Sequence, residues 1–263
     1  MRCIKGGGAR MSIPRAPGVF DATSEDCKES PLSLTETVED SGTMMNKLVI
    51  IGSGGHARVV LDMADRQGLQ VAGFIDDNKP EGHMVDGLPI LGGTQEIKRI
   101  AAQDGSIGFV AAIGDNFARA QAVRRVSAEC PGLVWASVID PSAVISRRTE
   151  IGEGAMILAG TVINPGVKIG RHVIVNNSCS IAHDTEFGAF SSAAPGVLTG
   201  GNVSVGELSH LGVGAAVSHG VKIGAHAVIG SGSAVVRDCP DHAVAYGVPA
   251  RIIRSRKAGD PYL

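Results

Sequence analysis

Aromatic residues are scarce in this chain of 263 residues, which contains one Trp, two Tyr and six Phe. A core with so few rings favours a thin, regular structure filled with Ile and Val. The five cysteines form no CxxC motif. We therefore expect no disulfide framework, no metal site and a cytoplasmic protein. Apolar runs stay short of the ~18 residues of a membrane helix. A net charge of −2 favours neither nucleic acid nor a membrane surface as a partner.

A repeat of six residues organises the chain between Ile139 and Val235. Every sixth position keeps one register without an insertion, and Thr199 is the one polar residue in this series. Two residues before each of these positions, from Thr149 to Ser233, stand only Ala, Ser, Thr, Cys or Val. A period of six fits neither an α-helix nor one long strand. It is the hexapeptide pattern of a parallel β-helix.

The repeat predicts short strands joined by corners, each directing one large side chain toward an inner axis. Three hexapeptides make one turn, so residues eighteen apart stack on successive rungs. Glycine often follows the large residue, and we expect it there because glycine tolerates the positive φ of a corner. These glycines are Gly152, Gly170, Gly188, Gly200, Gly206, Gly212, Gly224 and Gly230.

The pattern N-terminal to the repeat divides the chain further. Residues 1–45 show no periodicity and no apolar segment typical of a secretory signal, so we expect a disordered extension. One hypothesis is that the natural start lies at Met44. Residues 46–138 alternate between strands and helices, as in a small Rossmann-like domain. The β-helix is expected over 139–255, with a tail over 256–263.

Within the Rossmann-like domain, apolar runs and helical spacing locate the elements. Thr94 is expected to be the N-cap of the second helix. The predicted strands cover 48–51, 69–75, 109–113 and 133–139, and the predicted helices cover 57–64, 94–103 and 117–129.

The ends of three predicted strands carry residues suited to a nucleotide. Glycines in the loop 52–56 let the backbone approach a ligand, and the following helix offers free N–H groups to phosphate. Acids follow the second strand, and the carboxyl ends of parallel strands meet at one edge of the sheet. The alternative is that Asp77 and Asn116 only cap helices. The residues expected to bind the nucleotide are Gly54, Gly55, His56, Asp76, Asp77 and Gly114.

His183 and Asp184 are the candidate catalytic pair within the repeat. A histidine followed by a carboxylate can act as a general base whose protonated form the carboxylate stabilises. Gly201 comes eighteen residues later, directly over His183, and its N–H is a candidate donor to an oxyanion. Asn176 lies about one hexapeptide before the pair and is a candidate substrate contact. The alternative for His183 is a solvated surface imidazole.

The remaining histidines of the coil are weaker candidates. His172 and His226 are expected at the surface. His210 and His219 raise the question of zinc, which carbonic anhydrases with similar repeats bind through three histidines. No histidine stands five residues from His183, as such a site requires, so we expect no metal.

Four segments together resemble bacterial nucleotide-sugar acetyltransferases of the NeuD/PglD type: GSGGHARVV at 52–60, AIGDN at 112–116, AHD at 182–184 and YGVPAR at 246–251. The resemblance covers residues 46–255. It implies a homotrimer of left-handed β-helices with acetyl-CoA between neighbouring coils. It also implies an N-terminal domain that binds a UDP-, GDP- or dTDP-linked amino sugar. The implied reaction is N-acetylation in surface glycan biosynthesis.

The same resemblance implies roles for single residues. His183 is the base, Asp184 raises its basicity, and the Gly201 N–H stabilises the oxyanion. The residues implied to contact the cofactor acetyl-CoA are Val213 and Ser231 through their backbone, Arg251 at a phosphate, and Ser192.

Ser192 is a departure from the family pattern, because many members carry a second histidine there, near the acetyl group. A serine hydroxyl can donate a hydrogen bond but cannot carry charge. Two other functions stay open at this stage, namely O-acetylation of a sugar hydroxyl, as in sialic-acid-modifying relatives, and a non-catalytic trimeric scaffold. The sequence specifies neither the nucleotide base nor the sugar.

Overall fold

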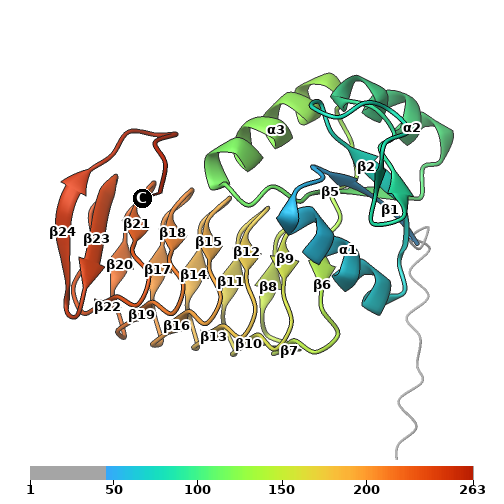
Figure 1. Cartoon of the computed structure of the whole chain (residues 1–263). Coiled ribbons are helices and arrows are strands. Elements are labelled where there is room, and N and C mark those ends of the chain that lie inside the picture. Colours follow the sequence, from blue (N-terminus) through green and yellow to red (C-terminus); the bar gives the residue numbers. More distant parts are fainter. Residues whose placement is uncertain (1–45, 263) are drawn as a thin grey trace, which may run out of the picture. The chain divides into compact units, whose positions relative to one another are not determined.

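The computed structural model describes residues 46–262, so the expected extension over 1–45 and the start at Met44 lie outside the described residues. The described chain belongs to one compact unit, in which an α/β region precedes a coil of short strands (Figure 1). None of its helices has both the length and the apolar character needed to cross a membrane.

The α/β region is built on a parallel three-stranded sheet of order β2-β1-β5. Leu48, Val49 and Ile50 of the central strand are fully buried, as expected for a parallel strand covered on both faces. The elements of this region are β1 (Lys47–Ile51), α1 (Gly55–Gln67), β2 (Gln70–Ile75), β3 (Met84–Val85), β4 (Leu88–Pro89), η1 (Thr94–Glu96), α2 (Ile97–Gln103), β5 (Ile107–Ala111) and α3 (Asn116–Glu129).

Two expected elements of this region differ in the structure. The second helix begins as the 3₁₀ turn η1, and its N-cap is Gly93 and not Thr94. The N–H of Thr94 instead donates to Asp77 Oδ1 over 2.7 Å. The strand predicted over 133–139 is also wrong. Only Trp135 forms a bridge to the sheet, and the segment then leaves to enter the coil.

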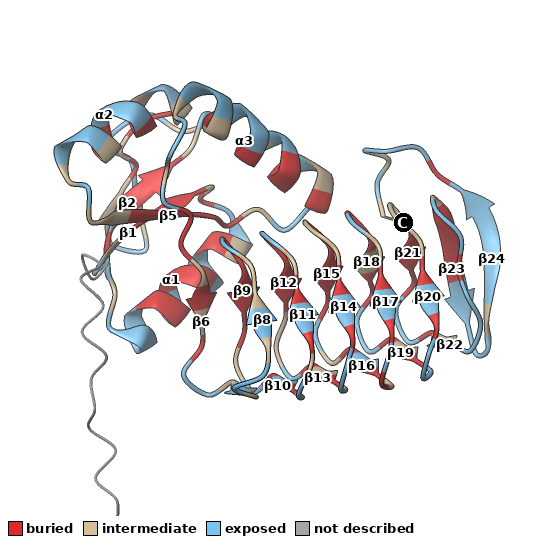
Figure 2. Ribbon diagram, turned by 180° about the vertical axis from the view of Figure 1, so that it is seen from behind, coloured by how far each residue is buried: buried red, intermediate tan, exposed pale blue. Residues whose placement is uncertain are grey.

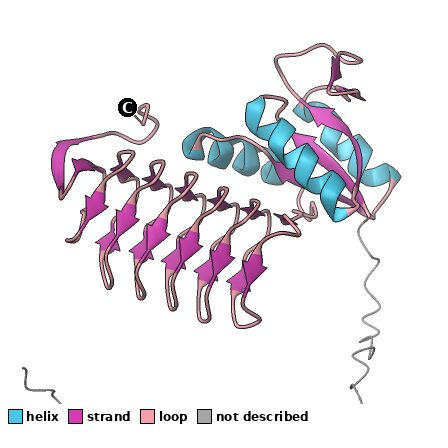
Figure 3. Ribbon diagram, turned by 60° about the horizontal axis from the view of Figure 1, so that its bottom comes forward, coloured by secondary structure: helices cyan, strands magenta, loops and turns pink. Residues whose placement is uncertain are grey.

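The coil is a left-handed parallel β-helix whose two-residue strands pair with strands eighteen residues away, as the repeat predicts. Figure 3 shows the rungs as parallel layers. Face 1 consists of β6 (Val138–Ile139), β9 (Met156–Ile157), β12 (Ile174–Val175), β15 (Ser192–Ala193), β18 (His210–Leu211), β21 (Val228–Ile229), β23 (Ala243–Gly247) and β24 (Ala250–Ser255). Face 2 consists of β7 (Val144–Ile145), β10 (Val162–Ile163), β13 (Ser180–Ile181), β16 (Leu198–Thr199), β19 (Ala216–Val217) and β22 (Ala234–Val235). Face 3 consists of β8 (Glu150–Ile151), β11 (Lys168–Ile169), β14 (Glu186–Phe187), β17 (Ser204–Val205) and β20 (Lys222–Ile223).

The interior of the coil follows the predicted hexapeptide pattern. The large residues at every sixth position from Ile157 to Val235 are buried, and so are the small residues two places before them. Cys179 is one of the small residues, and burial raises the pKa of its thiol to about 11. It is therefore a packing residue and not a nucleophile.

The corners of the coil do not use glycine as expected. Positive φ recurs at every sixth residue from Gly154 to Gly232, three places after the large residue, and includes Asp184. Gly152 and its equivalents lie outside this set. A Cβ on Gly152 would lie 2.6 Å from the backbone nitrogen of Arg171 on the next rung. Glycine is needed at these positions because the backbones of neighbouring rungs lie too close together for a Cβ, and not because φ is positive.

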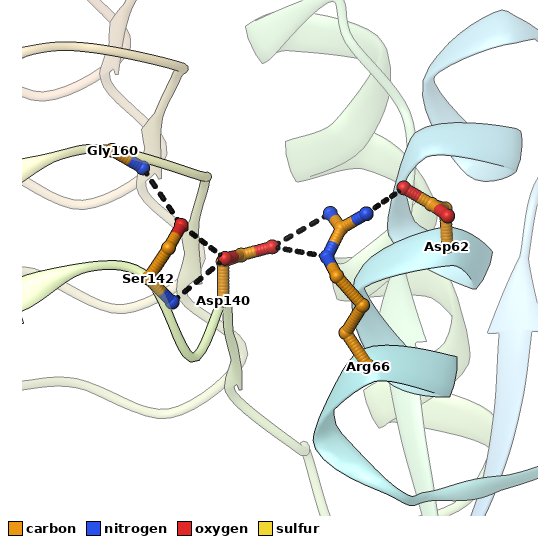
Figure 4. A network of polar contacts seen from close by, with 5 residues as sticks. All are labelled: Asp62, Arg66, Asp140, Ser142 and Gly160. Carbon is orange, nitrogen blue, oxygen red and sulfur yellow. Dashed lines mark hydrogen bonds and ion pairs between the residues drawn. The ribbon is translucent and has the colours of Figure 1, made fainter.

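The α/β region packs against face 1, where the buried sides of α1 and the coil strands meet (Figure 2). Arg66 of α1 donates from Nη2 to Asp140 Oδ2 over 2.6 Å, and Asp140 also accepts from Ser142 (Figure 4). Burial acts to raise the pKa of Asp140, but the hydrogen bonds from Ser142 and Arg66 outweigh it, so the pKa is lowered. This ion pair ties α1 to the first rung.

Arg119 of α3 makes the second connection to the coil. Its fully buried guanidinium donates to the carbonyl oxygens of His172 and Phe190 over 2.9 Å, and to that of Ile113 over 2.8 Å. The loop after β5 is thereby joined to two corners of the coil.

His172 lies in this junction and not at the surface as expected. It is buried, its ring stacks on Phe190 at 5.0 Å between centroids, and Trp135 meets it edge-on. Burial, and then the charge of Arg119, lower the pKa of His172 to about 4. The outward column of the repeat is here covered by the α/β region, which the coil periodicity does not reveal.

Candidate active site

His183 and Asp184 lie at the corner between faces 2 and 3, directly after β13. His183 Nδ1 and Asp184 Oδ2 are 2.7 Å apart, and the two side chains are 57% and 59% exposed. Asp184 has a φ of 57°, a conformation that aspartate tolerates better than most residues. A Cβ on Gly166, one rung below, would overlap its carboxylate. The backbone therefore presents the pair to solvent with Nδ1 already engaged.

Gly201 stacks on His183, as the eighteen-residue turn predicts. The N–H of Asn202 donates to the carbonyl oxygen of His183 over 2.9 Å, which fixes this register. A Cβ on Gly201 would lie 2.5 Å from Cε1 and Nε2 of the imidazole, so the ring occupies the space of a missing side chain. The N–H of Gly201 donates to no group within residues 46–262. An imidazole and a backbone N–H without a partner are therefore neighbours.

A second site lies in the α/β region, at the carboxyl edge of the sheet. It is a pocket of about 550 Å³ between the loops that follow β1, β2 and β5. Six residues predicted to bind a nucleotide line it together: Gly54, Gly55, His56, Asp76, Asp77 and Gly114.

The start of α1 forms one wall of this pocket. Gly54 is the N-cap, with no side-chain cap and no acidic residue in the first turn, so the N–H groups are available to an anion. No atom lies within 4 Å of a Cβ built on Gly54 or Gly55. Burial, and then the charge of Arg119, lower the pKa of His56 to about 4, so this wall imidazole is uncharged at neutral pH.

The acids of the pocket are already engaged with protein groups. Asp76 accepts from the Ser53 hydroxyl and from the N–H of Asn78. Asp77 accepts from the N–H of Thr94 and from Arg125 Nη2 over 2.6 Å. Burial acts to raise the pKa of Asp77, but these hydrogen bonds and the charge of Arg125 hold it below its ordinary value.

The helix-capping alternative fails for Asn116 and holds in part for Asp77. Asp115 is the N-cap of α3, accepting from the N–H of Ala118, while Asn116 is buried and donates to the carbonyl oxygen of Ser209. Asp77 binds the first N–H of η1 and also lines the pocket. Protein groups engage both carboxylate oxygens of Asp77, Oδ1 through the N–H of Thr94 and Oδ2 through Arg125.

The sequence reasoning missed Ser53, Thr94 and Arg125 as pocket residues. Arg125 stands three residues after Ala122, another lining residue, on one side of α3. The sequence signal that could have indicated Arg125 is its helical spacing, because residues three apart on α3 lie on the same side of the helix.

Two predicted ligand contacts lie on or beside face 1, away from His183. Ser192 is 4% exposed, and its hydroxyl is 2.8 Å from His210 Nδ1. Its strand faces the α/β region and the C-terminal Tyr262, whose ring stacks on His210, and the contact of Ser192 with acetyl-CoA stays a prediction. Asn176 is half-buried, with its side-chain oxygen bound to the N–H of Asn177.

The other predicted acetyl-CoA contacts lie at the corner between faces 1 and 2. Val213 and Ser231 stack on successive rungs there, because the N–H of Gly232 donates to the carbonyl oxygen of Val213. Both residues are exposed. Arg251 is exposed on β24 and donates to its neighbour's carbonyl. Arg254, which the sequence reasoning did not name, lines a depression together with Ser231. In one chain, none of these residues reaches His183.

The comparisons with known proteins agree with this architecture. Residues 47–126 match the PglD N-terminal domain family, and residues 148–183 match the bacterial transferase hexapeptide (six repeats). PerB from Caulobacter crescentus, solved in complex with CoA and GDP-perosamine, is 38% identical with a TM-score of 0.74, over 79% of this chain and 97% of that chain. The chain belongs to this family of nucleotide-sugar acetyltransferases.

Further relatives are similar to this acetyltransferase to a varying extent. The acetyltransferase domain of PglB from Neisseria gonorrhoeae, solved in complex with acetyl coenzyme A, is 30% identical with a TM-score of 0.73, over 79% of this chain and 99% of that chain. GDP-perosamine N-acetyltransferase of Escherichia coli O157:H7 is 28% identical over 77% of this chain and 84% of the relative. Matches to other curated relatives span less, down to 24% of a mimivirus protein.

The acetyltransferase thus carries an exposed imidazole-carboxylate pair on the coil and a polar pocket in the α/β region. In residues 46–262, no three His, Cys, Asp or Glu side chains gather as metal ligands would.

Proposed function

We propose that this acetyltransferase moves the acetyl group of acetyl-CoA to an amino group of a UDP-, GDP- or dTDP-linked amino sugar. The observation that carries the proposal is the exposed His183–Asp184 pair beside the free N–H of Gly201. Relatives named GDP-perosamine and UDP-N-acetylbacillosamine N-acetyltransferases support the substrate class.

The proposed reaction is direct transfer. The amine nitrogen attacks the thioester carbonyl carbon, and His183 Nε2 takes the proton that the amine loses. The Gly201 N–H donates to the oxyanion as it forms. The carbon–sulfur bond then breaks, and the thiolate of CoA takes up the proton. Asp184 accepts from Nδ1–H, which assigns the ring tautomer and stabilises the imidazolium.

The pocket of the α/β region is the proposed site for the nucleotide. We place the diphosphate at the start of α1, where Gly54 and Gly55 allow close approach and the helix dipole favours negative charge. Asp76 and Asp77 keep lone pairs for hydroxyl or base N–H donors. His56 and Gly114 complete the wall.

A homotrimer with active sites between the copies is the proposed assembly. The outward side of face 2 is an apolar stripe that includes Val144, 64% exposed, and Leu198, 49% exposed. Such exposed apolar strips mark interfaces. The stripe separates the His183 corner from the corner of Val213 and Ser231. A second copy on this face therefore brings the base of one copy to the proposed acetyl-CoA contacts of another, with Arg251 near a phosphate.

The proposed setting is the assembly of surface glycans, because a nucleotide-linked amino sugar is an activated donor for glycosyl transfer. Since acetyl-CoA and nucleotide sugars are cytoplasmic metabolites, we also propose the cytoplasm as the place of reaction.

A thiol-release assay with acetyl-CoA and a panel of nucleotide-linked amino and hydroxy sugars tests the function. We expect turnover on at least one amino sugar. His183→Ala should lower kcat about 10²–10⁴-fold, as expected for loss of a general base. Binding of the nucleotide sugar, measured by calorimetry, should be unchanged.

Three outcomes would contradict parts of this proposal. An unchanged kcat in His183→Ala would remove the base assignment. Turnover confined to hydroxy sugars would favour O-acetylation. A trimer that binds no acetyl-CoA would favour a scaffold.

A further inference from the structure

A second imidazole stands beside the proposed catalytic pair. His219 comes eighteen residues after Gly201 and thirty-six after His183, so the three residues form one outward column. The N–H of Gly220 donates to the carbonyl oxygen of Gly201 over 2.9 Å, which fixes His219 on the rung above Gly201. The side chain of His219 is exposed. Gly201 therefore forms a gap with an imidazole on each side.

The two rings lean toward each other across this gap. Rungs are spaced ~4.8 Å, so two rungs place backbone positions ~9.6 Å apart. The ring centroids of His183 and His219 are only 6.3 Å apart. A single oxygen bonded to one nitrogen of each ring permits centroids up to roughly 8 Å apart, given N···O distances near 2.8 Å. The separation of the two rings therefore allows one oxygen atom to bond to both.

We propose that His219 is a second oxyanion donor of the acyl-transfer site, which rests on the proposed function of His183. In this arrangement His183 takes the proton of the attacking amine. The ring N–H of His219 and the N–H of Gly201 both donate to the thioester carbonyl oxygen.

The role of His219 leaves the balance of the reaction unchanged. The nitrogen–carbon bond forms as the carbonyl electron pair moves to oxygen, and the carbon–sulfur bond breaks as that pair returns. The proton passes from the amine to His183 and then to the thiolate. His219 donates a hydrogen bond throughout and transfers no proton.

Ser192 does not supply a comparable donor within one chain. Ser192 is buried on face 1 and bonded to His210, so it offers no donor at the His183 corner. The column of His183 supplies an imidazole from two rungs away instead.

The test compares two variants of His219 in the full chain. His219→Leu removes the donor, whereas His219→Gln keeps an N–H at similar reach. We expect His219→Leu to lower kcat about 10- to 100-fold, since loss of an oxyanion donor costs up to ~10³-fold in a closed site and this one is exposed. His219→Gln should restore most of the rate. His83→Leu, which changes an exposed histidine of the α/β region, is the control and should leave kcat unchanged.

Binding separates this donor role from a general effect, even without a known sugar substrate. CoA lacks the acetyl oxygen, so His219→Leu should weaken acetyl-CoA about 2- to 10-fold by calorimetry and leave CoA unchanged, as expected for one hydrogen bond. An equal loss for CoA and acetyl-CoA, or no loss for either, overturns the inference. If His183→Ala also keeps full kcat, the proposed function fails as well. If His219→Leu changes neither kcat nor binding while His183→Ala lowers kcat, the proposed function stands without this donor.

Discussion

The geometry of the His183–Asp184 pair depends on two glycines on the neighbouring rungs. Gly166 below leaves room for the carboxylate, and Gly201 above leaves room for the imidazole. Asp184 itself occupies the left-handed position of the corner, with a φ of 57°. The pair is thus oriented by its own backbone and by the missing side chains of the two glycines, and in the described part of the chain no other side chain bonds to it.

Gly201→Ala tests this steric argument at the residue scale. The new Cβ would stand 2.5 Å from Nε2 and Cε1 of His183, so the ring must turn away from the free N–H. Because a misplaced base loses most of its contribution, we expect kcat to fall about 10²-fold or more. The Tm should change little, since the ring can move into solvent.

Gly105→Ala is the matched control, because a Cβ on Gly105 meets no atom within 4 Å. It should leave kcat unchanged. A Gly201→Ala enzyme with full activity would show that His183 does not work from the position over Gly201.

At the scale of elements, α3 connects the two parts of the site. It begins directly after the pocket residue Gly114, and Arg125 on its third turn lines the same pocket. Arg119, between them, binds the carbonyl oxygens of two coil corners. The helix therefore holds the proposed nucleotide pocket at a fixed place on the coil.

The sequence predicted the elements whose signal is local. The hexapeptide register, the stacking of Gly201 on His183 and the grouping of Asp76 and Gly114 at one sheet edge all follow from chain spacing. It did not predict contacts between distant segments. Thr94 is not the N-cap as expected, because its N–H donates to Asp77, seventeen residues earlier.

The sequence prediction did not foresee which part of the coil surface is buried. His172 and Ser192 occupy outward positions of the repeat, which periodicity assigns to solvent. The α/β region and the C-terminal tail cover this part of the coil, and no hexapeptide pattern encodes which face is covered. The segment 133–139 fails for a related reason, because its last residues pair with the coil and not with the sheet.

The junction around Arg119 predicts a pH dependence of stability. Burial first, and Arg119 second, lower the pKa of His56, His172 and His210 to about 4. An unfolded histidine has a pKa near 6.5. Their stabilising contribution is therefore complete above about pH 6.5 and is lost as the pH falls toward 4. We expect the Tm to drop through this range.

His172→Phe tests this origin of the pH dependence. Phe190 occupies the equivalent corner one rung away with a φ of 58°, against 53° for His172, so the backbone accepts a phenyl ring there. The variant should lose Tm less steeply between pH 6.5 and 4 in calorimetric scans. His83→Phe, at an exposed position, should keep the wild-type slope. Equal slopes in all three proteins would contradict the assignment to buried imidazoles.

At the scale of the whole molecule, the groups of the proposed site lie on separate parts of one chain. The proposed base lies between faces 2 and 3, and the proposed acetyl-CoA contacts lie at or beside the corner between faces 1 and 2. The proposed nucleotide pocket belongs to the α/β region on face 1. Face 2, between the first two of these, is the apolar one. The proposed trimer would bring these groups together, since each interface of a rotationally symmetric trimer joins different edges of two copies.

Mixed trimers test whether sites are shared between copies. His183→Ala removes the base, and Gly55→Trp should fill the nucleotide pocket, because nothing lies within 4 Å of a Cβ on Gly55. Each variant alone should be inactive. If each site combines the base of one copy with the pocket of the next, every mixed trimer holds one intact site in three, so the purified mixed trimers should show about one third of wild-type activity. The measurement is thiol release by trimers purified through a tag on each variant. Activity no higher than that of the single variants would show that base and pocket act within one chain.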